Sequence, residues 1–453
     1  MKPLVIIHGW SDEAESFRPL ADAIEQSTDR SVENLYLGNY VSLDDDVQMA
    51  DLVQGLARAW KQQRLPEESR GADVIIHSTG GLIVRDWLDS EYAIRSLKPP
   101  VNNLIMLAPA NIGSPLAHKG RAFYGRVFKG FKSKKRFNTG THILKALEMA
   151  SPYSWRLAER DRFTNNLFSA TGVRTTVIVG NTGYKGIKSI ANEPGSDGTV
   201  YVSTANLNCA RVDIHFPSGD RKPKVKAIKD SKGKTAFLVV DDCTHSTVAY
   251  KDDNATARKS VLNAIVEALG ITNAEDFDRW VDACTSNTNK VMKKYAEESR
   301  DYKHGFQNTV FHVHDDQGFE VQDYVLEFYH DTDAGDKDEL AEDFNKKAIR
   351  KVHAYGDNAA FRSFLINTDR LNEVLNKHNK NLCISLSAMP DLGDDNNLVG
   401  YRTFGDQDIG EMVLTPAQVR EFFQPNRTLF VDITLTREQK DELFWIRNRA
   451  DLE

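Results

Sequence analysis

The sequence predicts an α/β fold with a mostly parallel sheet for residues 1–270 and a β-rich, sandwich-like domain for residues 305–453. In the first part, short β-branched apolar runs alternate with longer segments of helical periodicity, which is typical of parallel strands covered by helices. From about residue 306, apolar and polar residues alternate one by one between turn-rich segments, which is typical of antiparallel strands. The length of 453 residues leaves room for these two domains.

The elements of the first domain follow from this pattern. Apolar residues spaced three and four apart predict helices around residues 17–24 and 49–60, and residues 255–269 predict a closing helix that ends at Gly270. Residues 271–304 are charged, with few apolar anchors, and are predicted to form a helical linker. The predicted strands are 4–8, 73–77, 104–108, 175–180 and 235–241.

The second domain is predicted to contain one helix, at about residues 368–377, among its strands. The alternating pattern is that of a small antiparallel sandwich. The predicted strands lie at 310–315, 321–328, 361–366, 382–386, 399–404 and 428–435.

Composition excludes several classes of protein. The net charge of -7 gives the whole chain no general attraction for nucleic acid. Its four cysteines form no CxxC pair, which argues against a zinc ribbon or a disulfide framework. No run approaches the ~18 apolar residues of a membrane span, and the run at 4–7 is too short for a signal peptide. A cytoplasmic protein is expected, or a secreted one whose leader has been removed.

The strongest chemical signal is the segment His77-Ser78-Thr79-Gly80-Gly81, where a predicted buried strand passes through a tight turn into an amphipathic helix. It resembles the nucleophile elbow of the α/β-hydrolase superfamily, in which the serine is the nucleophile. One position departs from the G-x-S-x-G pattern, because Ile76 stands two residues before the serine. A serine- and glycine-rich turn without chemistry is the alternative.

A second signal is His8-Gly9-Trp10, directly after the first predicted strand. In hydrolases of this superfamily such a turn supplies one backbone N–H of the oxyanion hole, and the residue after the nucleophile supplies the other. The resemblance therefore implies Trp10 N–H and Thr79 N–H as the donors. Alone, the His8-Gly9-Trp10 motif is weak evidence. Together with the elbow it becomes specific, because the loops that carry the two motifs leave the same edge of a parallel sheet.

A serine nucleophile needs a histidine to take its proton and an acid to orient that histidine. In such enzymes the acid and then the histidine follow the serine along the chain. Residues 193–205 are similar to the stretch that carries the acid in bacterial lipases and esterases, which implies Asp197. The loop after the last predicted strand implies His245 as the base. His215 is the competing candidate for the base, but its alternating neighbours are typical of a strand. For Asp197, the alternative is an Asp-Gly pair that only forms a turn. The rival acids are Asp213, Asp220, Asp241 and Asp242.

Residues 107–117 resemble the P-x-x-G-S-P-L-A loop of lipases and of glycosylphosphatidylinositol-deacylase-like hydrolases. The resemblance implies a helical lid over about residues 112–165. Within it, residues 119–136 mix lysines and arginines with aromatic residues and contain no acid, which suits an anionic lipid surface. A solvated basic helix face is an equal alternative. The residues expected at the pocket and lid are His8, Gly9, His77, Pro109, Phe123 and Phe128.

Histidines and aspartates gather in the second domain, but Asp-rich turns at strand ends are common, and no metal site is predicted. The cluster comprises His312, His314, Asp315, Asp316, His330, Asp331 and Asp333. An accessory domain that shields the pocket or docks on a substrate surface is the better interpretation.

Together the residues and the resemblance predict a serine carboxylic-ester hydrolase, an esterase or lipase, that needs no cofactor and takes an ester or lipid substrate. Ser78 would attack the ester, His245 would act as base and then acid, and Asp197 would orient the imidazole. A phospholipase or other lipid deacylase is the second hypothesis. A catalytically silent lipid- or protein-binding module on the hydrolase fold is the third.

Overall fold

The structure is a computed structural model, and it describes residues 2–7, 17–35, 46–117, 140–218, 223–330, 338–394, 396–402 and 412–444. The chain divides into two compact units. Unit 1 comprises Met1–Ala210, Asp230–Asn308 and Pro425–Thr428. Unit 2 comprises Arg211–Lys229, Thr309–Gln424 and Leu429–Glu453.

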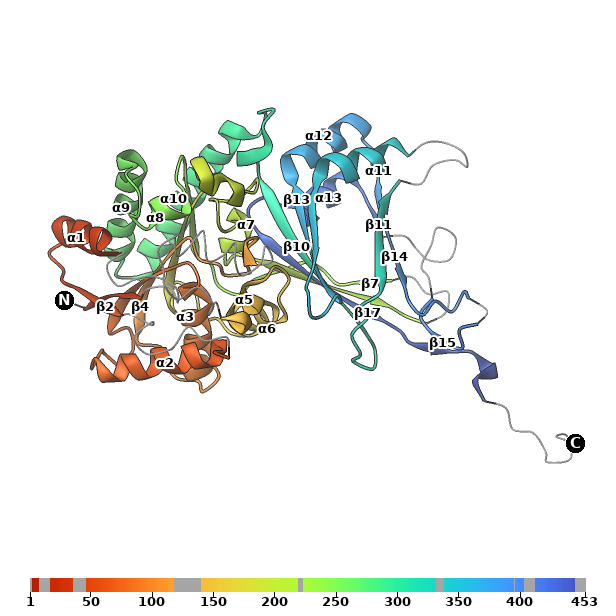
Figure 1. Cartoon of the computed structure of the whole chain (residues 1–453), viewed down its shortest axis with the longest axis horizontal. Coiled ribbons are helices and arrows are strands. Elements are labelled where there is room, and N and C mark those ends of the chain that lie inside the picture. Colours follow the sequence, from red (N-terminus) through yellow and green to blue (C-terminus); the bar gives the residue numbers. More distant parts are fainter. Residues whose placement is uncertain are drawn as a thin grey trace, which may run out of the picture. The chain divides into compact units, whose positions relative to one another are not determined.

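Unit 1 is built on a six-stranded sheet in which all neighbouring strands are parallel (Figure 1). All five predicted strands are present, and the sheet gains an edge strand, β2, that the sequence did not reveal. The strand order is β2 (Val32–Leu35), β1 (Leu4–Ile7), β3 (Ala72–His77), β4 (Val101–Leu107), β5 (Arg174–Gly180) and β9 (Ala236–Val240).

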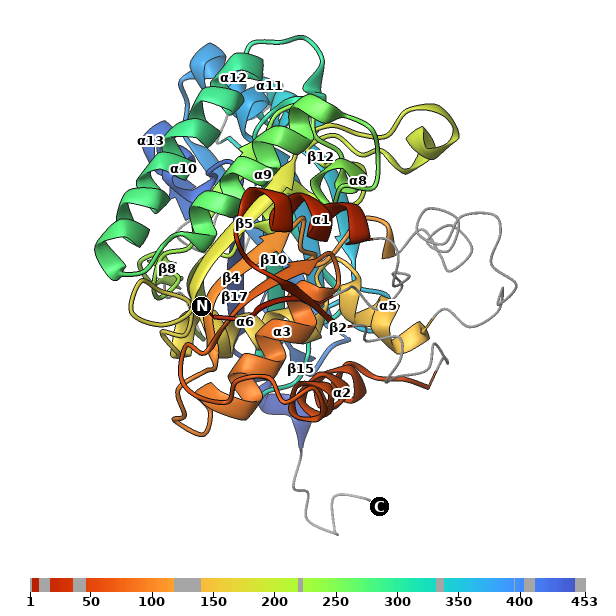
Figure 2. The same cartoon turned by 90° about the vertical axis from the view of Figure 1, so that its left-hand side faces the viewer.

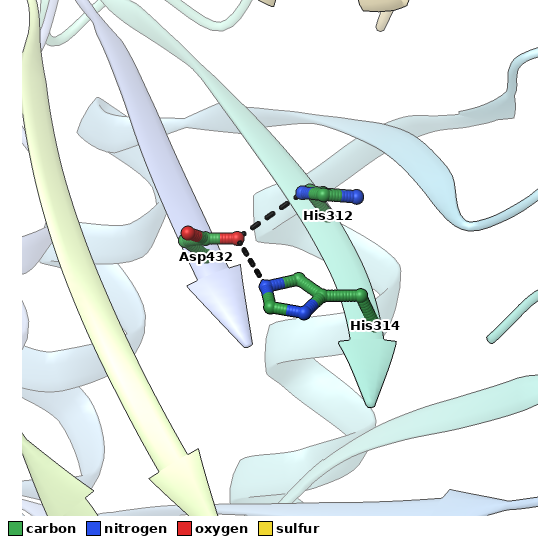
Figure 3. A group of neighbouring side chains, drawn as sticks. All are labelled: His312, His314 and Asp432. Atoms are coloured by element: carbon green, nitrogen blue, oxygen red, sulfur yellow. Dashed lines mark hydrogen bonds and ion pairs between the residues drawn. The ribbon is translucent and has the colours of Figure 1, made fainter. Parts of the chain in front are cut away.

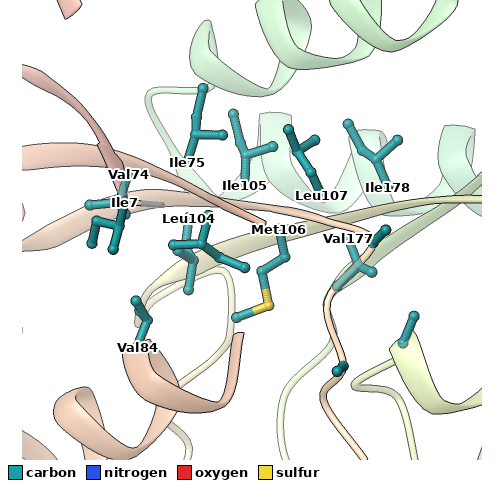
Figure 4. Close-up of a cluster of buried hydrophobic side chains, with 14 of the residues drawn as sticks. Ile7, Val74, Ile75, Val84, Leu104, Ile105, Met106, Leu107, Val177 and Ile178 are labelled. Carbon is teal, nitrogen blue, oxygen red and sulfur yellow. The ribbon is translucent and has the colours of Figure 1, made fainter. Parts of the chain in front are cut away.

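Apolar side chains leave both faces of this sheet. Ile75 and Ile105 point to one face, whereas Val74, Leu104 and Met106 point to the other (Figure 4). Strands that are buried on both faces require continuous apolar runs, which is why β3 and β4 read as unbroken hydrophobic segments.

Helices cover both faces of the sheet (Figure 2). One face carries α1 (Arg18–Ser27), α9 (Ala255–Leu269) and α10 (Ala274–Tyr295), and the other carries α2 (Met49–Gln62) and α3 (Gly80–Leu88). The remaining helices of the unit are short: α5 (Thr141–Leu147), α6 (Pro152–Ala158), α7 (Val202–Ala205) and α8 (His245–Val248).

The predicted linker differs from what the structure contains. Residues 274–295 do form a helix, α10, but this helix packs on β9 and belongs to unit 1. Trp280 donates from Nε1 to Thr176 Oγ1 at 3.0 Å, and Thr288 Oγ1 accepts from Val239 N–H at 3.0 Å. Its apolar residues recur at helical spacing but are outnumbered by charged and polar ones together, which concealed the buried face in the sequence.

Unit 2 contains a large mixed sheet in the strand order β12 (Ile349–Ala354), β13 (Phe361–Asn367), β10 (Phe306–Asp315), β17 (Thr428–Leu435), β6 (Ala210–Phe216) and β7 (Lys224–Val225), with β8 (Lys229–Asp230) paired to β6. A second sheet has the order β11 (Tyr324–Tyr329), β14 (Leu382–Ala388) and β16 (Met412–Leu414), and β15 (Val399–Gly400) pairs with β18 (Glu438–Gln439).

The β-rich character predicted for the second domain is confirmed, but three details differ. β10 and β17 are parallel neighbours, because hydrogen bonds join residues 308 to 427 and 316 to 435. β6 comes from the middle of the chain, so residues 211–229 join this unit. Besides the expected helix, α12 (Thr368–His378), the unit has α11 (Glu339–Asp343) and α13 (Pro416–Phe422). The capping box of Thr415 and Gln418 is a signal that could have predicted α13.

Among the described residues, no helix is long and apolar enough to cross a membrane.

Candidate active site

Ser78 lies on the tight turn between β3 and α3, with φ at +54°. A non-glycine residue in this left-handed region costs about 1–2 kcal/mol. Two backbone hydrogen bonds hold it there. Ser78 N–H donates to Leu107 O at 3.1 Å, and Ser78 O accepts from Ala110 N–H at 3.1 Å. The strand-to-helix turn thus presents the serine hydroxyl at the carboxyl edge of the sheet, as the nucleophile elbow requires.

The two glycines after Ser78 permit close packing at the start of α3. A Cβ at Gly81 would lie 2.8 Å from both Pro109 Cβ and Asn111 Oδ1, so no side chain fits there. A Cβ at Gly80 would lie 3.4 Å from Ile76 Cβ. Ile76, which replaces the usual elbow glycine, is fully buried and packs beside the bare Gly80. A Cβ at Gly80 would therefore only touch Ile76, and Gly81 is the position that requires glycine.

His245 begins α8, directly after the loop that follows β9. Thr244 caps this short helix in a capping box with Thr247, and both hydroxyls bond to Asp252 Oδ2. The imidazole Nε2 lies 3.2 Å from Ser78 Oγ, and Nδ1 lies 2.9 Å from Asp197 Oδ2. The structure thus brings together the three residues implied by the sequence resemblance, from three separate loops of unit 1.

Asp197 is fully buried in the loop after β5. Its Oδ1 accepts the N–H groups of Thr199 and Val200, each at 2.9 Å, while Oδ2 faces the imidazole. The backbone adds a second link, because His245 N–H donates to Asp197 O at 2.9 Å. Every oxygen of this carboxylate therefore has a donor, which allows a charged group to lie at full burial.

This arrangement sets the tautomer of His245. A carboxylate can only accept, so Nδ1 carries the proton that bonds to Asp197. Nε2 is then the bare nitrogen of the neutral ring, and it can accept the proton of Ser78 Oγ–H. The geometry can therefore convert the serine hydroxyl into a nucleophile.

His77, which is expected at the substrate pocket, is buried against His245, with ring centroids 4.6 Å apart. Its Nε2 lies 3.4 Å from His245 O, and Phe17 meets its other side at 5.4 Å. The side chain of His77, which leaves β3, supports His245 and limits how its ring can tilt.

A buried ion pair braces the turn from the helix side, and the sequence analysis missed it. Arg85 on α3 bonds to Asp161 at 2.7 and 2.9 Å, and both side chains are fully buried. Arg85 Nη1 also donates to Asn111 O in the loop after β4. The sequence offered one signal for this ion pair. Arg85 is a single arginine, seven residues after the nucleophile, on a helix that is otherwise apolar on its buried positions.

Three ionisable side chains close to Asp197, those of Tyr302, Tyr184 and Cys243, are neutral at neutral pH. Burial raises the pKa of Tyr302 to about 12, and it also raises the pKa of Tyr184 and of the Cys243 thiol. Cys243 comes two residues before His245 but has no thiolate character at neutral pH, so it offers no rival nucleophile.

The competing residues lie elsewhere. Asp241 bonds to Lys294 and Lys303, each at 2.9 Å, and Asp242 bonds to Lys303 at 2.6 Å. His215 stays a strand residue of β6, as expected, and Asp213 of the same strand pairs with Arg211. Asp220 lies outside the described residues.

Part of the predicted site lies outside the described residues. This applies to both the first oxyanion turn and the basic part of the lid: His8, Gly9, Trp10, Phe123, Phe128 and residues 119–136. Of the remaining lid, residues 141–147 and 152–158 are helical, as predicted. Pro109 is buried against Gly81, and Thr79 is the N-cap residue of α3, whose N–H has no acceptor within the helix.

A cavity of about 670 Å³ in unit 1 is not the substrate pocket. Arg70, Val101 and Arg174 line it, and the last two lie at the amino ends of β4 and β5. Ser78 follows the carboxyl end of β3, and ligands of open α/β sheets bind at that edge.

Comparison with known proteins supports the fold and the chemistry. No family model and no curated protein sequence matches the chain. Two solved structures of the phospholipase PlaB from Legionella pneumophila, one of them in complex with thio-NAD, match it with a TM-score of 0.82 and 25% identity, over 99% of this chain and 97% of that chain. The chain is an ester hydrolase of the α/β-hydrolase superfamily. This hydrolase shares its C-terminal β-rich region with the phospholipase as well as its parallel sheet, since the match covers nearly the whole chain.

Proposed function

We propose that this hydrolase is a phospholipase that cleaves an acyl ester bond of glycerophospholipids. The observation that carries the proposal is the match to a phospholipase over 99% of the chain, because it includes the β-rich region that a hydrolase core does not need. A hydrolase core alone would be compatible with many ester substrates.

The proposed acylation step uses Ser78, His245 and Asp197. His245 Nε2 takes the proton of Ser78 Oγ as the oxygen attacks the ester carbonyl, and a tetrahedral oxyanion forms. Asp197 stabilises the resulting imidazolium from the Nδ1 side. The C–O bond to the lysophospholipid then breaks, and the leaving oxygen takes the proton from Nε2.

In the proposed deacylation step, His245 activates a water molecule that attacks the acyl-serine ester. The fatty acid leaves and Ser78 regains its proton. The oxyanion of each step is assigned to two backbone donors, Thr79 N–H at the start of α3 and Trp10 N–H. Each such donor contributes about 2.7–4 kcal/mol to transition-state stabilisation.

We further assign residues 119–136 to contact with an anionic lipid surface. This segment contains eight cationic residues and five aromatic or branched apolar ones without an acidic residue. Cationic side chains attract anionic headgroups, and aromatic side chains favour the interface between headgroups and acyl chains. Such contact would bring the catalytic residues to substrate that is held in a bilayer.

The test is fatty acid release from vesicles of phosphatidylcholine with increasing phosphatidylglycerol content. The purified chain is expected to release fatty acid and lysophospholipid, and Ser78→Ala is expected to release neither. A fluorophosphonate probe should label the original chain but not Ser78→Ala. If the probe labels the chain but no fatty acid is released from any phospholipid vesicle, the phospholipase proposal is refuted. The chain would then be an esterase that acts on soluble esters. Absence of labelling would favour a silent binding module.

The lipid surface has its own test. Replacing Lys132, Lys134 and Lys135 by Ser should weaken binding to anionic vesicles by up to ~1 kcal/mol per charge and leave hydrolysis of a soluble p-nitrophenyl ester nearly unchanged. Equal losses on both substrates would contradict a membrane role for this segment.

A further inference from the structure

Three side chains of unit 2 converge on one face of its large sheet. His312 and His314 lie on β10, and Asp432 lies on the neighbouring β17 (Figure 3). Residues two apart on a strand point to the same face, so both imidazoles face the same way. Asp432 reaches them from the adjacent strand. Both strands belong to the interior of a sheet, which is a rigid support for a binding site.

The spacing of the converging atoms matches the spacing of metal ligands. Asp432 Oδ1 lies 3.1 Å from His312 Nδ1 and 3.2 Å from His314 Nε2, and all three atoms lie within 4.8 Å of one another. Two ligands at the usual ~2.0–2.1 Å from a tetrahedral Zn²⁺ are about 3.3 Å apart. The two distances to Asp432 Oδ1 already match this value, and the two imidazole nitrogens, which lie within 4.8 Å of each other, would close on the ion.

The outer nitrogen of each imidazole already has an acceptor. His312 Nε2 lies 2.9 Å from Glu320 Oε2, and His314 Nδ1 lies 3.0 Å from Asp315 O. Carboxylate and carbonyl oxygens only accept, so these outer nitrogens carry protons. In neutral imidazoles the inner nitrogens are then bare. Histidines that bind metals almost always donate their other N–H to such an oxygen.

Three lone pairs that meet at one point need positive charge among them. Protons on the imidazoles can supply it, and one divalent cation can take their place with direct bonds to all three atoms. Arg211 is the nearby cation and is engaged by the other oxygen of Asp432, at 2.6 Å.

The site is also pre-organised and open to loading. Phe361 stacks on the ring of His312, with centroids 4.1 Å apart and planes at 9°. The side chains of His312, His314 and Asp432 are 16%, 23% and 16% exposed, so an ion can reach them from solvent. Two imidazoles and one carboxylate favour Zn²⁺ over Mg²⁺ or Ca²⁺, which prefer oxygen ligands alone.

We propose that His312 Nδ1, His314 Nε2 and Asp432 Oδ1 bind one Zn²⁺ ion, with water as the fourth ligand. The ion would join β10 to β17 and stabilise unit 2. This site is separate from Ser78 and does not depend on the proposed phospholipase activity.

The experiment measures zinc binding by the full-length chain without an affinity tag. After treatment with a chelator and dialysis, isothermal titration with ZnCl₂ at pH 7.5 should show one site per chain, and Zn²⁺ should raise the melting temperature. In a Co²⁺-loaded sample, visible absorption bands typical of four-coordinate cobalt should appear. His314→Ala and Asp432→Asn should each weaken zinc binding at least 100-fold, and Glu320→Gln should weaken it about 10–100-fold.

Two variants serve as controls. His353→Ala removes a partly buried histidine of β12 in the same sheet, and Arg211→Gln removes the ion-pair partner of Asp432 without removing a ligand. His353→Ala should bind Zn²⁺ as the original chain does, Arg211→Gln should weaken binding less than Asp432→Asn does, and circular dichroism should confirm that every variant is folded. The proposal is wrong if the folded original chain binds no Zn²⁺ at micromolar concentration. It is equally wrong if the ligand variants bind as well as the controls, or if Arg211→Gln loses as much affinity as Asp432→Asn.

Discussion

The substitution Asp197→Asn tests the proposed role of the acid most sharply, because the structure dictates how the new amide must lie. Thr199 and Val200 present two N–H donors to Oδ1 of the carboxylate. The amide oxygen of Asn must occupy this position, so its NH₂ group must face His245 Nδ1. The imidazole then has to accept at Nδ1 and carry its proton on Nε2. In that tautomer it cannot accept the proton of Ser78 Oγ–H.

The expected loss is large, whereas the fold should persist. Restoring the reactive tautomer would set two donors against each other in a fully buried position. The corresponding change in an analogous triad lowers turnover by about 10⁴, which is about 5.4 kcal/mol of transition-state stabilisation. We expect kcat/KM for a soluble p-nitrophenyl ester to fall by about 10³–10⁴. The two backbone bonds to the side-chain oxygen remain, so the melting temperature should change little.

The matched control is Asp241→Asn, which changes an acid that follows β9 but makes no contact with His245. Asp241 accepts hydrogen bonds from Lys294, Lys303 and Tyr295 instead. Its kcat/KM should stay within about twofold of the original, while its melting temperature falls. If Asp197→Asn retained more than a tenth of the activity and Asp241→Asn were severely impaired, the assignment of Asp197 would be refuted.

Three further outcomes are expected. Ser78→Gly and Ser78→Ala should both be inactive, but the glycine variant should be more stable to urea by about 1 kcal/mol, since only glycine adopts positive φ without strain. Arg85→Met should lower the free energy of unfolding by about 3–5 kcal/mol, because it leaves the buried Asp161 charge unpaired, whereas loss of the exposed Arg95 should change it by less than about 0.5 kcal/mol. Burial alone would raise the pKa of Asp241, but hydrogen bonds from lysines outweigh it and hold that pKa well below its usual value. The free energy of unfolding of the original chain should therefore exceed that of Asp241→Asn by its full amount above about pH 5, and this difference should shrink below ~3.9. Denaturation at a series of pH values measures it. A difference that grows on acidification would contradict this reasoning.

The sequence predicted the parallel sheet because its strands are buried on both faces and therefore read as continuous apolar runs. β2 was missed because it is a four-residue edge strand of mixed composition, Val-Glu-Asn-Leu. The burial of α10 was missed for a related reason. Its apolar face is narrow, and charged and polar residues together outnumber the apolar ones in its 22-residue sequence. Local composition reports the average environment of a segment, whereas packing depends on one face of it.

For the candidate active site, the resemblance implied Ser78, Asp197 and His245, but the rival acids stayed open until the structure placed Asp197 Oδ2 beside the imidazole. The support given by His77 to His245 could not be read from the sequence. It depends on the contact of two tilted rings that are 168 residues apart in the chain, and the sequence shows His77 only as the residue before the nucleophile. The buried ion pair between Arg85 and Asp161 could not be read from the sequence either, because its two residues are also far apart in the chain.

The sheet, the elbow and the order of serine, acid and histidine could be predicted from the residues alone, since strand burial, turns and motif spacing are local properties. Only the tertiary structure decided which carboxylate meets the imidazole and which residues join His312 and His314. Asp432 is 118 residues from His314 and lies beside it because β10 and β17 are neighbours in the sheet. The pairing of strands distant in the chain depends on the packing of the whole unit, and no local pattern of residues encodes it.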